Sequence, residues 1–399
     1  MAARAATHAL TMIATRQPTT RIPIYRDVRV LKWAFQLVVF AIVAAIAYWL
    51  YGNYRTNTAA SGIPTNYNFL GQPTTFDIPG ADFNPQERVR NAYVIGILNT
   101  LRVSVLGIIL ATVLGILIGI GRLSTNWVVN KLATVYVEMI RNLPLLVILT
   151  FTVLGLVLQA IPPIREAWEP FGLFVFSNRG MGFPWYRDVS GYALFALFLF
   201  AAGGWWAIAR WRSGLSDRTG EPARSGLLGG GFFLVTMIAG WFILGGTVDL
   251  ASVEGPRVVG GIGVDPSYFA VLVALVVYTA SHIAEIVRGS IQAIPRGQGE
   301  AASALALSAY QRMWHIILPQ AMRIAIPPLG NQYLNLTKNS SLAAGFAYFD
   351  ITLVTQITVG NGSPAIPAFT LALMVYVVIS LVTSALVNVA NRRFKLVER

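Results

Sequence analysis

Cysteine is absent from this 399-residue sequence, and histidine occurs only three times. The lack of cysteine excludes disulfide bonds, and three scattered histidines leave no ligand set for a structural zinc site. His282 and His315 are therefore predicted to pack at an interface or cap a helix rather than bind a metal. No cluster of His, Asp and Glu gathers in one loop, which argues against a membrane-embedded enzyme.

Charged residues are also scarce. They make up 12% of the chain, about half the share usual in soluble domains, while 55% of residues are hydrophobic and the mean hydropathy is +0.60. Uncharged runs of 18 or more residues recur, and such runs predict transmembrane helices. The first run has about 20 apolar residues, too many for a signal peptide, and is predicted to be an uncleaved span. The pattern predicts an all-α polytopic membrane protein with about eight transmembrane helices, at residues 33–52, 92–121, 133–161, 190–209, 226–247, 267–285, 324–349 and 366–390.

Acidic residues are fewer than basic ones, 17 against 30, which leaves a formal net charge of +13. Lys and Arg gather in the cytoplasmic loops of membrane proteins, so this excess does not indicate nucleic acid. With a cytoplasmic N-terminus, the cytoplasmic segments hold 20 Lys and Arg, and the opposite side holds 7. Both termini are therefore predicted to be cytoplasmic, as an even number of spans requires.

A Gly-rich phosphate-binding loop is missing as well. The four lysines, Lys32, Lys131, Lys338 and Lys395, all lack the Gly-Lys-Ser/Thr context of such a loop. Any ATP hydrolysis must therefore belong to a separate chain. The alternative, a stand-alone ion-coupled secondary amino-acid transporter, needs a buried acidic residue in mid-span. Only Glu138 comes near this, and it is predicted to lie at a helix end.

The segment between the sixth and seventh spans, residues 285–323, does not resemble a simple loop. It is rich in Ala, Leu and Glu, which favour helix, and Pro319 is predicted to end or bend that helix. An apolar stripe at helical spacing needs a partner or lipid to cover it. The polar side lacks the Lys and Arg density of a lipid-surface helix, which favours a protein partner. The stripe consists of Leu305, Ala309, Met313 and Ile316.

The same segment resembles the coupling loop of ABC importer permeases. That family carries Glu-Ala-Ala, three residues, Gly, nine residues, Ile, one residue and Leu-Pro. This chain matches the spacing but has Ala306 in the Gly place, where Ala favours a continuous helix. We expect either a milder turn or a bend at a neighbouring residue. The resemblance implies ATPase coupling through Glu300, Ala301, Ala302, Leu305, Ala306, Ile316, Leu318 and Pro319.

Further motifs resemble one branch of this family, the polar amino-acid permeases of the histidine/glutamine type. They lie at residues 99–104, 136–145, 288–300, 318–321, 327–332 and 338–342. They imply a type I ABC importer permease core of five spans. The additional first span and the insert with two further spans resemble the Q-type permease subunit of general L-amino-acid importers (the AapQ/BztB group).

The resemblance implies a transport subunit of the bacterial inner membrane and not an enzyme. It implies import of L-amino acids, polar and acidic or of broad range, delivered by a periplasmic amino-acid-binding protein. A second homologous permease would complete a heterodimer, two ATPase subunits would bind the coupling loop, and membrane lipid would surround the spans. No cofactor is expected in this chain, ATP and magnesium are expected at the partner ATPase, and no nucleic acid is expected.

The predicted organisation follows from the spans and the resemblance. Residues 53–91 are expected to be an extended periplasmic loop, and the aromatic-rich residues 162–189 to lie along the outer membrane interface. The segments are a cytoplasmic N-tail at 1–32, the first span and periplasmic loop at 33–91, the first part of the core at 92–161, an inserted region at 162–266, the second part of the core at 267–392 with the coupling loop at 285–323, and a cytoplasmic C-tail at 393–399.

Ionisable residues at membrane depth are costly and are functional candidates by default. Glu138 and Arg141 are spaced to form an ion pair, or alternatively contact cargo. Lys338 lies in a polar strip that either packs against the partner permease or coupling segment, or lines the path. Asp350 is expected to be solvated, and Arg102 to extend toward the outer interface. The candidate path residues are Glu138, Arg141, Asn331, Lys338, Asn339 and Ser340.

Overall fold

The computed structural model describes residues 27–62, 64–81, 83–219 and 225–394. Nearly all of the predicted N-tail and C-tail lies outside the described residues. The chain forms two compact units, Met1–Asn66 and Tyr67–Arg399.

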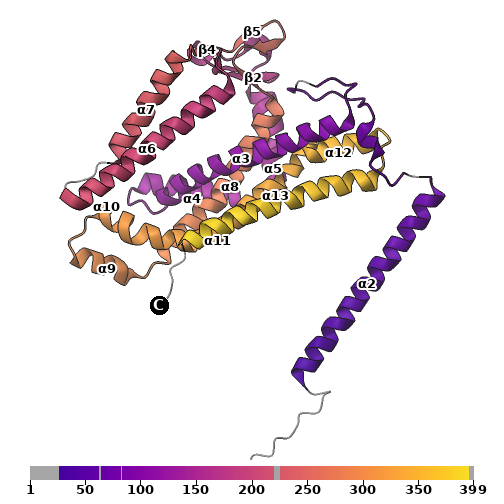
Figure 1. Cartoon of the computed structure of the whole chain (residues 1–399), viewed down its shortest axis with the longest axis horizontal. Coiled ribbons are helices and arrows are strands. Elements are labelled where there is room, and N and C mark those ends of the chain that lie inside the picture. The colour runs from indigo at the N-terminus through magenta and orange to yellow at the C-terminus, as the bar shows by residue number, and fades with distance from the viewer. Residues whose placement is uncertain (1–26, 63, 82, 220–224, 395–399) are drawn as a thin grey trace, which may run out of the picture. The chain divides into compact units, whose positions relative to one another are not determined.

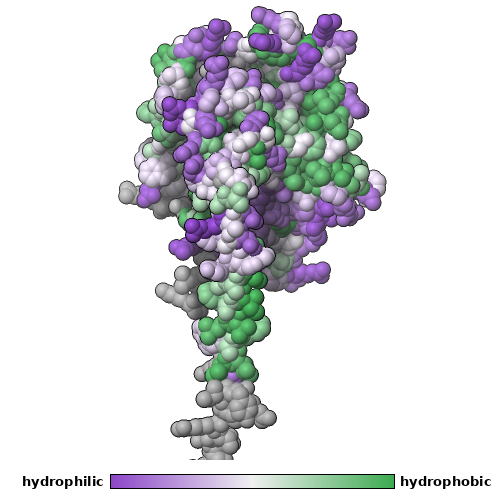
Figure 2. Space-filling model, turned by 90° about the vertical axis from the view of Figure 1, so that its right-hand side faces the viewer, coloured by the Kyte–Doolittle hydropathy of each residue, from purple (hydrophilic) through white to green (hydrophobic). Residues whose placement is uncertain are grey.

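The first unit contains one long helix, α2 (Val28–Ala60). Its 33 residues extend about 50 Å, more than the hydrocarbon thickness of a bilayer. Large apolar side chains such as Trp33, Phe40 and Trp49 are exposed along it, and Figure 2 shows its largely hydrophobic surface. The predicted first span is therefore a helix, longer at both ends than the uncharged run that indicated it.

Helices α3 (Val89–Gly121) and α8 (Pro266–Gln292) form the centre of the second unit and pack along each other (Figure 1). Two glycines of α3 allow this close approach. A Cβ added to Gly115 would lie 2.6 Å from Ile283, and one added to Gly119 would lie 2.8 Å from the carbonyl oxygen of Ala284. Small residues at such spacing let helix backbones approach closely in membranes.

The predicted third span is not a straight helix. Helix α4 (Trp127–Arg141) ends before Pro144, and α5 (Leu145–Thr150) continues through π-helical turns to Ala160, so that the two parts meet at 105°. Pro144 lacks a backbone N–H and disfavours helix in the residue before it. The predicted span over 133–161 is therefore a bent pair of helices.

The predicted seventh span is also bent. Helix α11 (Leu318–Asn339) passes into 3₁₀ turns to Phe346, and α12 (Ile351–Gly360) follows at 42°. Asp350 begins α12, where its Oδ1 accepts the backbone N–H groups of Thr352 and Leu353. This carboxyl group is fully buried, so the expectation that Asp350 is solvated was wrong.

The last helix, α13 (Ala365–Phe394), follows a short turn and packs against α11 and α12. The described residues contain six helices long and apolar enough to cross a membrane, or up to eight if each bent pair is one span. This agrees with the predicted all-α polytopic class of about eight spans.

The inserted region forms a helical hairpin of α6 (Gly191–Thr219) and α7 (Ser225–Ile243), in which the Phe232 ring fills the space left by Gly204. At one end, the loops flanking the hairpin form three small antiparallel sheets, with pairs β1–β2, β2–β7, β3–β4 and β5–β6 (Figure 1). Residues 162–189 are thus partly strand, which the sequence did not predict. The strands are β1 (Val175–Ser177), β2 (Gly180–Phe183), β3 (Trp185–Arg187), β4 (Thr247–Asp249), β5 (Ser252–Glu254), β6 (Arg257–Val259) and β7 (Ile262–Val264).

The segment before α3, predicted as an extended loop, packs its apolar side chains on the core. Phe69 and Ile78 are buried against α3 and α12 residues. Just before α3, Glu87 accepts a hydrogen bond from the Asn91 amide, and this bond lowers the pKa of the carboxyl group. The loop therefore forms one wall of the end of the bundle at which α3 begins.

Candidate functional site

The predicted coupling loop is a helix-turn-helix between α8 and α11. Helix α9 (Arg296–Ala304) follows Pro295, and α10 (Ala309–Arg312) begins with a capping box between Ser308 and Gln311. Both helices lie at one end of the bundle, away from the strands (Figure 1). The segment is built from local capping interactions and therefore has a defined shape of its own.

Ala306 forms the turn between these helices, with a left-handed φ of 53°. The N–H of Leu307 bonds to the carbonyl of Ala302 at 3.2 Å, and the N–H of Ala306 bonds to that of Ser303 at 2.9 Å. This pattern is a Schellman motif, whose left-handed position is usually Gly. The expectation of a milder turn or of a bend at a neighbouring residue was therefore wrong, because the closing hydrogen bonds impose the turn at Ala306 despite its Cβ atom.

The tip of this segment exposes large apolar groups. The exposed fraction is 75% for Leu305, 71% for Tyr310 and 55% for Trp314, and the rings of Tyr310 and Trp314 stack 6.2 Å apart. Among the predicted coupling residues, Glu300, Ala301, Leu305 and Ala306 are exposed, Ala302 is buried, and Ile316, Leu318 and Pro319 are half-buried. An apolar tip of this kind requires a covering surface.

One side-chain contact ties α9 to α10, and another ties α9 to α11, the transmembrane helix that follows. The Arg312 guanidinium donates to Ser303 Oγ at 3.0 Å, and the Gln320 amide donates to Gln298 Oε1 at 3.3 Å. Of the two predicted effects of Pro319, ending the helix was wrong, because the helix continues after π-helical turns over Met313–Ile317 that directly precede Leu318 and Pro319. The tip and α11 are therefore joined by continuous helical backbone.

One carboxylate joins three helices just before this segment. Glu285 of α8 forms ion pairs with Arg122 at the end of α3, with Arg288 one turn along α8 at 2.5 Å, and with Arg141 at the end of α4 at 3.7 Å. A cavity of about 320 Å³ lies at this junction and is lined by Glu138 together with Arg122, Arg141 and Glu285. Glu138 makes no ion pair within the described part of the chain. The predicted Glu138–Arg141 pair was therefore wrong.

The polar strip of α11 divides into two faces. Asn331, Asn335 and Lys338 are exposed at helical spacing, so no part of the described chain covers them. Asn339 is half-buried, and the fully buried Ser340 donates its hydroxyl to the carbonyl of Thr337 at 2.8 Å. The structure thus keeps the first three as candidates for a path or a partner contact, while Ser340 faces the interior of the chain.

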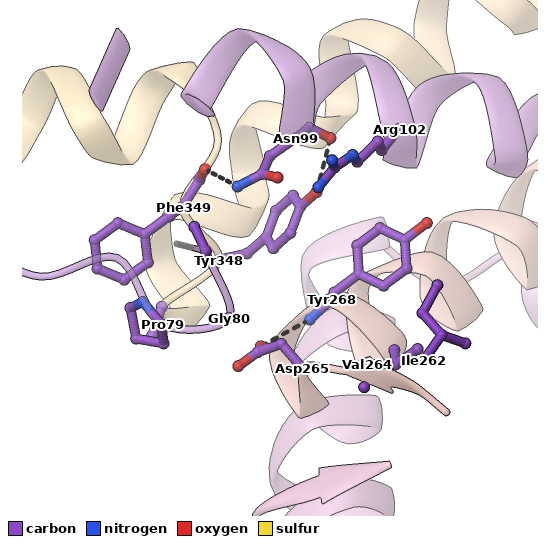
Figure 3. Close-up of a pocket in the computed structure, with 13 residues that line it drawn as sticks. Pro79, Gly80, Asn99, Arg102, Ile262, Val264, Asp265, Tyr268, Tyr348 and Phe349 are labelled. Atoms are coloured by element: carbon purple, nitrogen blue, oxygen red, sulfur yellow. Dashed lines mark hydrogen bonds between the residues drawn. The ribbon is translucent and has the colours of Figure 1, made fainter. Parts of the chain in front are cut away.

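A polar pocket of about 430 Å³ lies where α3, the start of α8 and the 347–349 turn meet (Figure 3). The Asn99 amide donates to the carbonyl of Phe349 at 2.9 Å, and the Tyr348 hydroxyl donates to the carbonyl of Asn99 at 2.7 Å. Arg102, an exposed residue, also lines this pocket, and its place near the outer membrane interface stays a prediction. The charge of Arg102 within an apolar helix was the signal in the sequence.

The pocket and the helix-turn-helix lie at opposite ends of α8. Asp265 caps the first turn of α8, and the helix then runs 27 residues, about 40 Å, toward α9. This length exceeds the hydrocarbon thickness of a bilayer. The two candidate sites therefore lie at opposite ends of a helix long enough to cross a membrane.

Comparisons with known proteins agree with this arrangement. Residues 111–396 match the family described as the binding-protein-dependent transport system inner membrane component. The general L-amino acid transport system permease protein AapQ of Rhizobium johnstonii is 38% identical over 374 residues, which cover 92% of this chain and 92% of that protein. The glutamate/glutamine/aspartate/asparagine transport system permease protein BztB of Rhodobacter capsulatus is 35% identical over 409 residues, which cover 94% and 96%.

A solved structure of an amino acid ABC transporter with histidines is 18% identical and covers 76% of this chain and 94% of that chain, with a TM-score of 0.45. The family match spans most of the present chain, and AapQ and BztB align with it over nearly their full lengths. This chain belongs to the family of inner membrane components of binding-protein-dependent transport systems, as a multi-pass protein of the inner membrane.

Proposed function

We propose that this chain is the permease subunit of an ATP-driven importer of L-amino acids, coupled to a separate ATPase through α9 and α10. The observation that carries the proposal is the exposed apolar tip formed by Leu305, Tyr310 and Trp314 on a capped helix-turn-helix. The full-length relatives AapQ and BztB, described as amino-acid permeases, support the choice of cargo.

The proposed complex contains a second homologous permease, two ATPase subunits and a periplasmic amino-acid-binding protein. ATP and magnesium bind at the ATPase, and the chain termini and α9–α10 face the cytoplasm. Closure of the ATPase pair on ATP moves the tip, and the contacts of Arg312 and Gln320 carry this motion into α11. The exposed strip of Asn331, Asn335 and Lys338 on α11 then lines the path or meets the second permease.

Co-purification with the ATPase encoded beside this chain tests the proposal, together with uptake of labelled glutamine into vesicles. Glu300→Arg reverses an exposed charge one helical turn from Arg296 on the coupling segment, and we expect loss of both the ATPase and uptake. Glu166→Arg, an exposed charge reversal near the strands, is the matched control and should keep the ATPase.

Each result has a distinct meaning. Normal ATPase retention and uptake in Glu300→Arg would reject α9–α10 as the coupling element. Uptake that persists after deletion of the ATPase would support the stand-alone ion-coupled transporter instead. Insertion of every variant in the membrane is checked by its amount in solubilised membranes.

A further inference from the structure

The pocket at the strand end of the bundle carries two opposite charges on separate walls. Arg102 comes from α3, and Asp265 precedes α8 (Figure 3). Within the described residues, neither side chain forms an ion pair. Arg102 is the one charged residue between Asn91 and Gly121, and a cation without a partner in such a helix is costly. The pocket therefore offers a cation that forms no ion pair within the described residues and can meet the charge of a ligand.

Asp265 is held in place by the backbone and keeps an acceptor for a ligand. Its Oδ1 accepts the N–H groups of Ser267 and Tyr268, at 2.8 Å and 3.2 Å, which caps α8. Its Oδ2 has no hydrogen-bond partner in the part of the chain that is described. A carboxylate oriented in this way can accept hydrogen bonds from an ammonium group.

The remaining walls of the pocket are rigid, small or apolar. The Tyr268 and Tyr348 rings lie 5.7 Å apart. The Asn99 amide donates to the Phe349 carbonyl and the Tyr348 hydroxyl donates to the Asn99 carbonyl, and these two bonds hold one side in position. The other lining residues are Pro79, Gly80, Ala81, Ile262, Gly263, Val264 and Ala347, none of which carries a charge. A volume of about 430 Å³ falls within the usual range of small-molecule sites, roughly 300–1,000 Å³.

We propose that this pocket binds the zwitterionic group of an α-amino acid, with Arg102 at the carboxylate and Asp265 at the ammonium. This assignment rests on the proposed function, since it identifies the cargo class by its chemistry. The two charges of the pocket are matched by the two charges that every α-amino acid shares. No charged group remains to read a side chain, so the site accepts neutral amino acids of varied side chain and disfavours a second carboxylate.

Direct binding of labelled glutamine to the purified permease–ATPase complex, without the binding protein, tests the assignment. We expect Arg102→Gln to weaken binding at least about ten-fold, because it removes charge-assisted hydrogen bonds. Arg102→Lys should keep most of the affinity. Arg90→Gln, which removes a charge from the first turn of the same helix outside the pocket, is the control and should bind as the wild type does.

The ammonium contact is tested with glutaramic acid, which is glutamine without its α-amino group. The wild type should prefer glutamine, and Asp265→Asn should lose most of that preference, since Asn still caps the helix but carries no charge. The assignment would be overturned if Arg102→Gln kept its affinity for glutamine, or if Asp265→Asn kept its preference for glutamine over glutaramic acid. It would also be overturned by a wild-type complex that transports glutamine without binding it directly.

These outcomes separate the pocket from the function of the chain. If the wild type imports amino acids in an ATP-dependent manner but Arg102→Gln binds them normally, only the pocket is wrongly assigned. If the wild type shows no ATP-dependent uptake of any amino acid, the proposed function itself fails.

Discussion

Substitution of Glu285 by Gln should loosen the junction of α3, α4 and α8. The carboxylate forms hydrogen bonds with Arg122 and Arg288 and lies 3.7 Å from Arg141. Without it, three guanidinium groups share a small volume with no counter-charge that contacts them. Hydrogen bonds to charged groups each contribute about 1.5–3 kcal/mol, and breaking a buried pair also leaves an uncompensated charge.

The expected loss of unfolding free energy in Glu285→Gln is smaller than the sum of these contributions. Glu285 and Arg288 are each 27% exposed, so water screens part of the interaction, and Gln keeps an acceptor oxygen. We therefore expect the unfolding free energy to fall by about 2–4 kcal/mol. For a unit of this size, this corresponds to a thermal midpoint roughly 5 °C lower.

The midpoint is measured on the purified complex in detergent at one fixed scan rate, because unfolding of such proteins is often irreversible. Glu138→Gln is the matched control, since Glu138 lines the same cavity and forms no ion pair in the described structure. Equal midpoints for the two variants would refute the reasoning. Combining Glu285→Gln with Arg122→Met should cost less than the sum of the single changes, and additivity would show that the pair is not coupled.

Three further predictions test the fold by single substitutions. Ala306→Gly should stabilise the turn by about 1 kcal/mol, because Gly adopts the left-handed φ of 53° without the steric cost of a Cβ atom. Amide hydrogen exchange in the turn should then be slower. Faster exchange would contradict the idea that Ala306 is strained. Gly115→Ala should lower the thermal midpoint, because its Cβ would lie 2.6 Å from the Ile283 side chain. Gly289→Ala is the control and should leave the midpoint unchanged, since nothing lies within 4 Å of its Cβ. Equal losses of midpoint in the two variants would reject the close packing of α3 on α8. Asp350→Ala should destabilise the protein by about 2–4 kcal/mol, because the buried carboxylate caps α12 and also accepts the Tyr376 hydroxyl. Tyr376→Phe removes only the second of these bonds and should cost less. A lower thermal midpoint for Tyr376→Phe than for Asp350→Ala would contradict this.

The sequence alone predicted the class of the protein, most of its spans and the segment proposed to couple it to an ATPase. Hydrophobic length indicates a transmembrane helix without reference to any other part of the chain, because the bilayer supplies the environment. The spacing from Glu300 to Pro319 is likewise local, so the resemblance to ABC permeases was visible in one loop. The sequence did not predict the sharp turn at Ala306, because the helix propensity of Ala is a weak effect that the closing hydrogen bonds of the turn outweigh.

Only the tertiary structure decided which charges meet. Arg141 contacts Glu285 rather than Glu138, and Arg102 faces a pocket whose other walls come from distant parts of the chain. The strands were equally hidden from the sequence, since segments of three or four residues such as β7 and β2 pair across the whole inserted hairpin. Hydropathy and helical spacing describe neighbours along the chain, whereas ion pairs, pockets and sheets depend on which helices pack together. Helix packing is determined by the shape of small-residue contacts such as Gly115 with Ile283, and those contacts exist only after folding.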